Sequence, residues 1–142
     1  MFDFVVIGAG VVGGLVAREL TKYKLSVCIL EKESDVAMGA TRANSAIVHA
    51  GFDAKEGTLK ALLNVRGSKM MQSVCSEVGV KYKRNGSLVV GFSEEDRATL
   101  EDLLVRGTKN GVKGLRVIDR EEILSLEPNI GEGVTVALHA PT

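Results

Sequence analysis

The residues in this chain that are best placed to do chemistry are a group of glycines near its start and an acid that follows them. Gly8, Gly10 and Gly13 have the G-x-G-x-x-G spacing. Glu31 follows eighteen positions after Gly13. Glycines at this spacing let a pyrophosphate approach the backbone at a helix N-terminus, and such an acid can accept hydrogen bonds from ribose hydroxyls. The pattern therefore predicts a dinucleotide site whose phosphate turn is formed by Gly8, Gly10, Val11, Val12 and Gly13.

The segments around the glycines have the patterns needed to position them. Residues 4–7 form a short apolar run that is typical of a buried parallel strand. Residues 12–23 carry apolar side chains at three- and four-residue steps, which predicts a helix with one buried face. A second strand, residues 27–30, leads to Glu31. A tight turn in an unrelated α/β sheet is the alternative, but the order strand, turn, helix, strand and acid favours a Rossmann-type nucleotide site.

A polar segment follows the acid where a nicotinamide-binding fold would continue with a helix and a strand. Residues 39–51 lack a helical apolar stripe and carry hydroxyl, amide and guanidinium groups, so we expect them to lie against a ligand. A hydrogen-bonded surface loop is the alternative, since these residue types also favour turns. The candidate contacts in this region are Lys32, Thr41, Arg42, Asn44 and Ser45, although Lys32 could equally be a solvated side chain.

The motifs from residue 39 onward resemble a known family. Residues 39–51 read G-A-T-x-x-N-S-x-x-x-H-A-G, and residues 52–61 continue with the E-G-T-L-K-A pattern. With the glycine turn, this resembles the FAD-binding N-terminal region of the D-amino-acid-oxidase-type flavoprotein superfamily. Within it, the chain is most similar to the anaerobic-type FAD-dependent glycerol-3-phosphate dehydrogenases and to the L-2-hydroxyglutarate oxidases. Asn85–Val90 and Leu126–Asn129 extend the resemblance over essentially the whole chain.

The resemblance implies FAD as the cofactor and an α/β fold. The fold would be a Rossmann-like FAD-binding βαβ sheet of the glutathione-reductase type, followed by the start of an antiparallel substrate-side region. We expect residues 1–79 to belong to the FAD-binding domain and residues 80–142 to begin the substrate or cap region. The family's FAD domain is discontinuous, so we also expect this chain to be an N-terminal fragment that lacks the C-terminal remainder and is inactive alone.

The resemblance also implies roles for particular residues. Thr41, Arg42, Asn44 and Ser45 would line the pyrophosphate and the approach to the flavin ring. His49, in the H-A-G motif, would lie near the flavin, as a base toward a substrate hydroxyl, as a covalent flavin attachment or as an orienting group. A purely structural histidine is the alternative.

The implied activity is a two-electron oxidation of a C–H group that bears a hydroxyl, less readily an amine, with the hydride passing to FAD. Glycerol 3-phosphate is the first substrate candidate, and L-2-hydroxyglutarate or another 2-hydroxy acid is the second. A nucleotide-binding module without catalysis and a nicotinamide-dependent dehydrogenase are the alternative functions. The sequence leaves the electron acceptor and the flavin linkage open.

Composition excludes several other classes of protein. The chain has 18 Lys and Arg and 18 Asp and Glu, so its net charge of zero and its lack of single-sign runs give no reason to expect nucleic acid as a partner. No apolar run is long enough to cross a bilayer, and the start does not resemble a signal peptide. Cys28 and Cys75 are far apart, which suits a reducing, cytoplasmic location, and no metal-site spacing is present. Peripheral membrane contact and self-association remain open.

The remaining chain contains further helix and strand signals. Thr58 is expected to cap a helix ending near Val78, and Ser93 a second helix ending at Asn110 and Gly111. The inward face of the first helix would carry Leu59, Leu62, Leu63, Arg66, Met70, Val74 and Val78.

Short strands and one further cap are expected between and after these helices. Residues 80–83 and 87–92 would form a hairpin around Asn85-Gly86. Residues 115–118 and 134–140 would be strands, with Asp119-x-x-Glu122 as a capping box for a brief helix between them.

Overall fold

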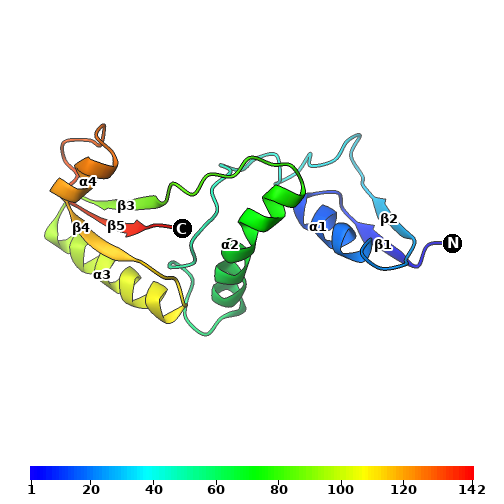
Figure 1. Ribbon diagram of the computed structural model, residues 1–142, viewed down its shortest axis with the longest axis horizontal. Coiled ribbons are helices and arrows are strands. Elements are labelled where there is room, and N and C mark those ends of the chain that lie inside the picture. Colours follow the sequence, from blue (N-terminus) through cyan, green and yellow to red (C-terminus); the bar gives the residue numbers. More distant parts are fainter. The chain divides into compact units, whose positions relative to one another are not determined.

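The computed structural model describes residues 1–142, which divide into two compact units, Met1–Ile47 and Val48–Thr142 (Figure 1). Unit 1 holds the glycine turn, Glu31 and the polar loop up to Ile47, and unit 2 begins just before His49. The boundary expected after residue 79 concerns the domains of a complete enzyme and stays a prediction.

Unit 1 is a βαβ unit with the order expected from the sequence. Its elements are β1 (Phe4–Ile7), α1 (Val11–Leu20) and β2 (Val27–Leu30). The two strands are parallel, with Phe4 opposite Val27 and Ile7 opposite Leu30. Their starts are tied together because the Asp3 carboxylate accepts hydrogen bonds from the Ser26 amide (2.8 Å) and hydroxyl (2.7 Å). This pairing sets the register that carries Glu31 to the same end of the sheet as the glycine turn.

Apolar side chains of unit 1 are largely exposed in this structure. Ala17 is the buried residue of α1, whereas the side of the helix that the sequence predicted to be buried includes Val12, which is 73% exposed, and Tyr23 just beyond it, which is 69% exposed. Three of the four residues of β1 are also exposed. The predicted burial is therefore wrong here. Two strands and one helix are too few elements to bury the apolar side chains on both faces of the sheet and on the helix.

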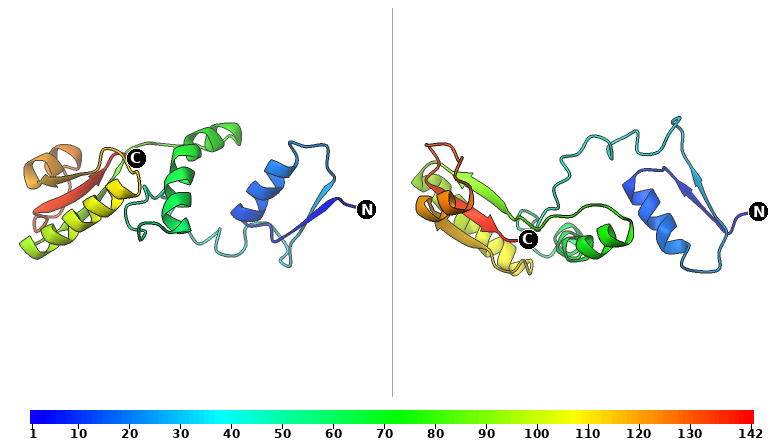
Figure 2. Two further views of the ribbon diagram at one scale, coloured as in Figure 1. Left: turned by 90° about the horizontal axis from the view of Figure 1, so that it is seen from below. Right: turned by 45° about the horizontal axis from the view of Figure 1, so that its top comes forward.

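Unit 2 contains a three-stranded antiparallel sheet and three helices, of which the last two pack against the sheet. Its sheet has the order β3 (Ser87–Gly91), β5 (Val136–Ala140), β4 (Arg116–Asp119), so the last strand of the chain is the central one. Both views of Figure 2 show β5, in red, beside the yellow end of α3. The helices are α2 (Leu59–Glu77), α3 (Glu94–Lys109) and α4 (Arg120–Leu126). This arrangement confirms the expected α/β class, with a parallel βαβ start and a later antiparallel region.

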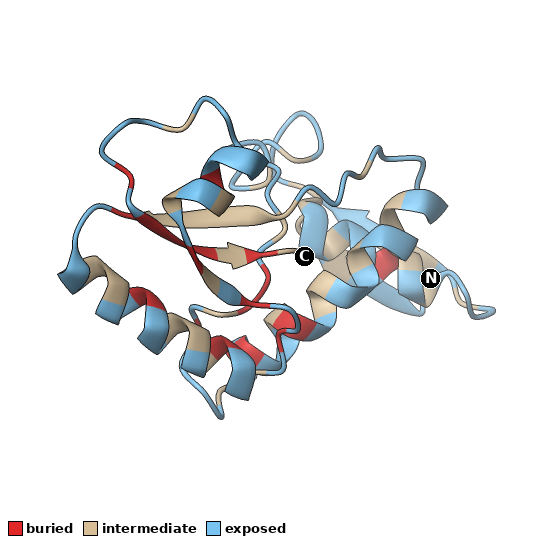
Figure 3. Ribbon diagram, turned by 60° about the vertical axis from the view of Figure 1, so that its left-hand side comes forward, coloured by how far each residue is buried: buried red, intermediate tan, exposed pale blue.

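The two faces of β5 bury two different apolar clusters. Val136 and Leu138 pack on the side of α3, whose Leu100 is 3% exposed. Ala137 points to the other side, where it packs with Ile118 of β4 and Ile123 of α4. Buried residues therefore gather along β5 and on the inner sides of the two helices (Figure 3). Burial on both faces explains why residues 136–140 are nearly all apolar or small.

The hairpin expected around Asn85-Gly86 does not form. Residues 80–83 have no strand, and β3 pairs instead with β5, with Ser87 opposite Ala140. Gly86 has a positive φ of 72°, and a Cβ there would lie 2.8 Å from the carbonyl oxygen of Ala140. The glycine is therefore needed for a close approach to a distant strand, which a local turn pattern cannot reveal.

Two of the three predicted helix caps are present. The Thr58 hydroxyl accepts a hydrogen bond from the Ala61 amide at 3.2 Å, and the Ser93 hydroxyl accepts one from the Asp96 amide at 3.2 Å. The capping box at Asp119 is absent, since its carboxylate instead pairs with Arg97 of α3.

Glu122, the second residue of the expected capping box, also has a partner on another element. Glu122 forms an ion pair with Arg116 of β4 at 2.6 Å. Ion pairing with neighbouring elements has therefore replaced the local cap, because a carboxylate gains more from a charged donor than from a neutral amide.

The buried side of α2 also differs from the expectation. The structure buries Ala61 and Val65, whereas Leu59 is 72% exposed and Arg66 is exposed. Of the other apolar residues predicted to face inward, Leu62, Leu63, Met70 and Val78 are also exposed, and Val74 is half-buried. Small residues occupy the contact because the loop at Gly51 packs directly on Val65.

Candidate functional site

The glycine turn of unit 1 brings a strand end and a helix start into direct contact. Gly8 has a φ of 98°, in the region that favours glycine, and its amide donates to the Leu30 carbonyl at 2.7 Å. A Cβ on Gly13 would lie only 1.9 Å from the Gly8 carbonyl oxygen. These two glycines are therefore required by the backbone geometry, as the spacing predicted.

The start of α1 exposes backbone donors at this turn. The first intrahelical bond runs from the Gly14 amide to the Gly10 carbonyl at 2.9 Å, so earlier amides have no helical acceptor. The Val11 amide donates to the Thr41 hydroxyl at 2.9 Å. The amides of Val12 and Gly13 have no protein acceptor. They form a pair of donors at the positive end of the helix dipole, which suits an anionic ligand.

Glu31 is held beside the turn by backbone hydrogen bonds. One carboxylate oxygen accepts from the Ala9 amide at 2.7 Å, and the other accepts from the amides of Lys32 (2.9 Å) and Glu33 (3.1 Å). The bonds from Ala9 and then Glu33 hold the pKa of the Glu31 carboxyl below its usual value. The carboxylate is therefore ionised at neutral pH and fixed at the end of β2, next to the phosphate turn.

The polar loop after β2 returns to the turn. The Ala37 amide donates to the Ala9 carbonyl at 3.0 Å, and Ala37 has a positive φ of 60°. Thr41 then supplies the cap that Gly10 cannot, because its hydroxyl oxygen accepts from the Val11 amide. Thr41 is therefore brought to the turn, and its contact with a cofactor stays a prediction.

The other predicted residues of the loop lie on its exposed side. The Arg42 guanidinium lies 3.9 Å from the Met38 sulfur, and the Asn44 side chain accepts from the Ala46 amide at 2.7 Å and donates to the Thr41 carbonyl. Ser45 is exposed. Lys32 is exposed and pairs with Glu33 at 3.3 Å. These side chains are accessible to a ligand, and the structure holds none of them against the turn itself.

His49 lines a cavity of about 200 Å³ within unit 2. The cavity is bounded by the loop from Ala50 to Ala54 and by Lys60 and Asn64, which lie four residues apart on α2. Gly51 has a φ of 107°, and a Cβ there would lie 2.5 Å from the Val65 side chain, so the loop is pressed against the helix. Sequence reasoning missed Lys60 and Asn64, although their i, i+4 spacing places them on one helix face.

The loop after His49 is fastened to α3. The Asn110 side-chain amide donates to the carbonyls of Gly51 (3.0 Å) and Ala54 (2.7 Å). Arg106 donates to the carbonyl of Asp53 at 3.2 Å. These contacts fix the shape of the loop that carries the wall of the His49 cavity.

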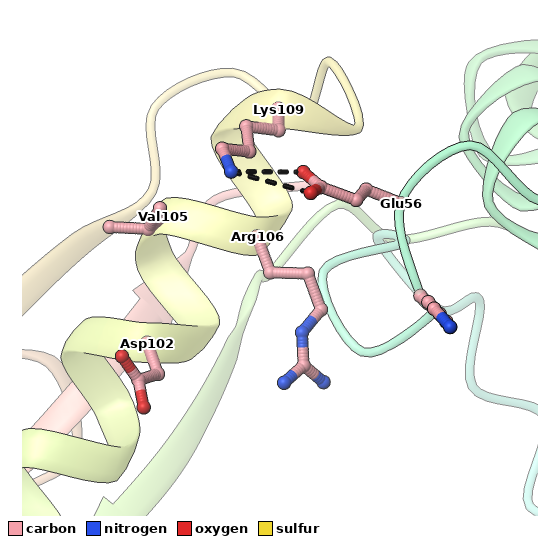
Figure 4. Close-up of a pocket in the computed structure, with 6 residues that line it drawn as sticks. Glu56, Asp102, Val105, Arg106 and Lys109 are labelled. Atoms are coloured by element: carbon pink, nitrogen blue, oxygen red, sulfur yellow. Dashed lines mark hydrogen bonds and ion pairs between the residues drawn. The ribbon is translucent and has the colours of Figure 1, made fainter.

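A larger, open hollow of about 540 Å³ lies between this loop and α3 (Figure 4). Lys109 crosses it to form an ion pair with Glu56 at 3.1 Å, drawn as dashed lines. Because Lys109 pairs with Glu56 and Arg106 donates to the Asp53 carbonyl, the contacts in this hollow hold the loop to α3, and we assign it no reactive role. None of the predicted site residues lines it.

No group of three or more His, Cys, Asp or Glu side chains is arranged to hold a metal ion. No helix is both long and apolar enough to cross a membrane.

Comparison with known proteins gives the family. The model of the FAD dependent oxidoreductase family matches residues 3–142. This chain belongs to that family. FAD, the cofactor expected from the sequence, is therefore confirmed, and so is the resemblance to flavoproteins that the loop motifs indicated.

Several relatives and solved structures of this flavoprotein family resemble the chain. It is 49% identical over 142 residues to a glycerol 3-phosphate dehydrogenase of Caloramator mitchellensis, covering all of this chain and 30% of that protein. It is 38% identical to the mitochondrial L-2-hydroxyglutarate dehydrogenase of Dictyostelium discoideum, covering all of this chain and 32% of that protein.

Among solved structures, an FAD-bound, dithionite-reduced L-α-glycerophosphate oxidase from Mycoplasma pneumoniae matches with a TM-score of 0.85 and 31% identity. The match covers 99% of this chain and 38% of the oxidase. The flavoprotein chain thus spans about a third of the length of the proteins it resembles.

Proposed function

We propose that this chain holds the adenine-dinucleotide part of FAD in an oxidoreductase that oxidises a secondary alcohol group, with glycerol 3-phosphate as the first substrate candidate. The observation that carries the proposal is the pair of backbone amides, at Val12 and Gly13, that point from the start of α1 without a protein acceptor. A pyrophosphate fits these donors because Gly10 has no side chain to obstruct its approach.

Other residues of unit 1 would complete the cofactor contacts. Glu31 would accept hydrogen bonds from the adenosine ribose, since its carboxylate is already fixed at the end of β2. The Thr41 oxygen already accepts from Val11, so its O–H is free to donate to a phosphate oxygen. Arg42, Asn44 and Ser45 lie on the accessible side of the same loop and would add contacts to the cofactor. Lys32, which is exposed and follows Glu31, would contact the adenine side of the site.

His49 is proposed as the base of the reaction. Bound FAD supplies the hydride acceptor, and the alcohol proton needs an acceptor on the protein. A neutral imidazole can hold that proton. Its cavity also contains Lys60 and Asn64, a cation and a neutral donor that suit an anionic substrate with hydroxyl groups. This supports substrates that carry a phosphate or a carboxylate.

The two substrate candidates differ in their support. The named relative at 49% identity is a glycerol 3-phosphate dehydrogenase, whereas the L-2-hydroxyglutarate dehydrogenases range from 38% to 41%. The second candidate, L-2-hydroxyglutarate, therefore remains the alternative within the same chemistry.

Titration with FAD, and with NAD as a competitor, tests the cofactor site. We expect FAD to bind and NAD to compete poorly. Glu31→Gln should weaken FAD binding by about 10-fold, since a charged acceptor to two hydroxyls is lost. Glu33→Gln is the matched control, because its carboxylate makes no contact with the turn. Equal FAD affinity in Glu31→Gln and the unaltered chain would refute the assigned ribose contact.

Anaerobic reduction of the flavin tests the substrate and the base. In the full-length, FAD-loaded enzyme that contains this chain, glycerol 3-phosphate should bleach the flavin faster than L-2-hydroxyglutarate does. His49→Asn should slow this reduction by about 100-fold or more while leaving FAD affinity unchanged. If neither compound reduces the flavin, the substrate proposal is wrong. If the substrate reduces the flavin of His49→Asn at the normal rate, the base is another group.

A further inference from the structure

The cavity at His49 has two charged side chains without partners. Lys60 and Asp53 both line it, the first from α2 and the second from the loop that follows His49. Neither the Lys60 ammonium nor the Asp53 carboxylate forms a hydrogen bond or an ion pair, with each other or with any other group of the chain. The two charges are of opposite sign and share one cavity, so each is available to a different end of a bound molecule.

The backbone around Asp53 is fixed by α3. The Asp53 carbonyl accepts a hydrogen bond from Arg106 at 3.2 Å. The carbonyls of Gly51 and Ala54, on either side of it, accept from the Asn110 side chain at 3.0 Å and 2.7 Å. These three bonds set the position of Asp53 in the cavity wall before a ligand arrives, which lowers the cost of binding one.

The α2 side of the cavity favours an anion. Lys60 lies in the first turn of α2, where the partial positive charge of the helix dipole adds to that of its ammonium group. Asn64 follows one turn later, and its side-chain oxygen would lie 3.2 Å from a Cβ on Gly51, so this side chain reaches the loop. The cavity therefore has a cationic side on the helix and an anionic group, Asp53, on the loop.

We propose that Asp53 determines substrate specificity: its carboxylate accepts a hydrogen bond from a terminal hydroxyl of the substrate and rejects a carboxylate at the same place. This inference rests on the proposed function, in which His49 takes the proton of the alcohol. Lys60 then holds the anionic end of the substrate. The substrate class is thus a polyol with a single anionic end, such as a phosphate monoester, rather than a dicarboxylate.

The two substrate candidates differ in this respect. Glycerol 3-phosphate carries its phosphate and its free primary hydroxyl on opposite sides of the carbon that is oxidised, so it offers an anion to Lys60 and a donor to Asp53. L-2-hydroxyglutarate has a carboxylate at each end. Whichever end pairs with Lys60, the other brings a second negative charge to Asp53, and such like-charge contacts reject a ligand.

Two phosphonates of equal length test this preference without any oxidation. 3-Hydroxypropylphosphonate ends in a hydroxyl, 2-carboxyethylphosphonate ends in a carboxylate, and neither has a secondary alcohol. Their binding to the full-length, FAD-loaded enzyme that contains this chain is measured by calorimetry. The hydroxyl compound should bind about 10-fold more tightly or better. If it does so while glycerol 3-phosphate leaves the flavin oxidised, the proposed substrate is wrong and the role of Asp53 stands.

Three variants assign the preference to particular side chains. Asp53→Asn keeps the size of the side chain and should bring the two affinities within about 2-fold of each other, mainly because the carboxylate compound binds better. Lys60→Gln should weaken both compounds by about 10-fold and leave their ratio unchanged. Lys55→Gln is the control, because Lys55 lines the neighbouring hollow and not this cavity, and it should change neither affinity.

Three results would overturn the proposal. They are equal affinities of the two phosphonates for the unaltered enzyme, no binding of either compound, and an unchanged ratio in Asp53→Asn. The comparison in the unaltered enzyme needs no variant, so it decides the matter even if Asp53→Asn fails to fold.

Discussion

Two neighbouring glycines of α1 allow a sharp test of the phosphate turn. At Gly13, a Cβ would lie 1.9 Å from the Gly8 carbonyl oxygen and 3.4 Å from the Val6 side chain. At Gly14, a Cβ would meet nothing within 4 Å. Both residues lie in the same helix, so alanine brings the same gain in helix propensity at each position. The difference between the two variants therefore isolates the contact with β1.

The expected magnitudes follow from these distances. Gly14→Ala should stabilise unit 1 by up to about 1 kcal/mol. In Gly13→Ala, the new methyl group meets a backbone atom that cannot rotate away, so the helix must move by more than 1 Å from the strand. Overpacking of this kind costs about 3 kcal/mol at the upper end of its range. After the propensity gain, Gly13→Ala should destabilise unit 1 by about 2 kcal/mol.

Hydrogen exchange and FAD titration measure the two consequences. Exchange of the Gly8 amide, which is bonded to Leu30, reports the opening of unit 1 directly. It should be faster in Gly13→Ala and unchanged or slower in Gly14→Ala, and only Gly13→Ala should lose FAD affinity. Similar exchange in the two variants would show that α1 does not pack on the turn as closely as described, and the assigned role of the glycines would fail.

Three further predictions concern both units. Gly107→Ala should destabilise unit 2 by about 1–2 kcal/mol in denaturant unfolding, because a Cβ there would lie 2.4 Å from Leu115, whereas Gly67→Ala, with open space around it, should be neutral or stabilising. Ser93→Ala should cost about 1 kcal/mol in the same assay through loss of the α3 cap; an unchanged midpoint would contradict it. The lowered pKa of Glu31 contributes stability above the ordinary glutamate pKa, which should be lost as the pH falls below it. The free energy of unfolding, measured over a pH series, should show this loss. In Glu31→Gln, the part of the pH dependence that comes from Glu31 should be absent.

The features that could be predicted from the sequence depend on contacts between near neighbours in the chain. The glycine spacing predicted the turn because the local backbone geometry requires a glycine at each of these positions. The caps at Thr58 and Ser93 were also predictable, since the hydroxyl bonds an amide three residues ahead. Glu31 was placed at the turn for a similar reason, because a short strand carries it there.

The features that were missed depend on partners that are distant in sequence. Asn85-Gly86 has the local pattern of a hairpin, yet Gly86 serves a contact with Ala140. The Asp119 carboxylate forms an ion pair with Arg97, on another helix, and does not cap α4. No local pattern distinguishes the two outcomes, because the competing partner is brought in only by the tertiary fold.

The site shows the same division. Thr41 was expected near the cofactor, but its bond to the Val11 amide, across 30 residues, follows from the positive φ of Ala37 and the path of the loop. Lys60 and Asn64 were missed beside His49 because the loop from Ala50 to Ala54 had to be folded onto α2 before the cavity existed.

The central position of β5 has a consequence for how unit 2 folds. Both neighbours of β5 precede it in the chain. Its pairing with β3, in which Ser87 lies opposite Ala140, closes a segment of more than 50 residues. Until residues 136–140 insert, β3 and β4 have no bonds to each other, and each presents an unpaired edge. The slow step in folding should therefore be this insertion, a non-local event with a large loop-closure cost. Because both apolar clusters meet on the same strand, they should form together or not at all, which makes unit 2 a single cooperative element.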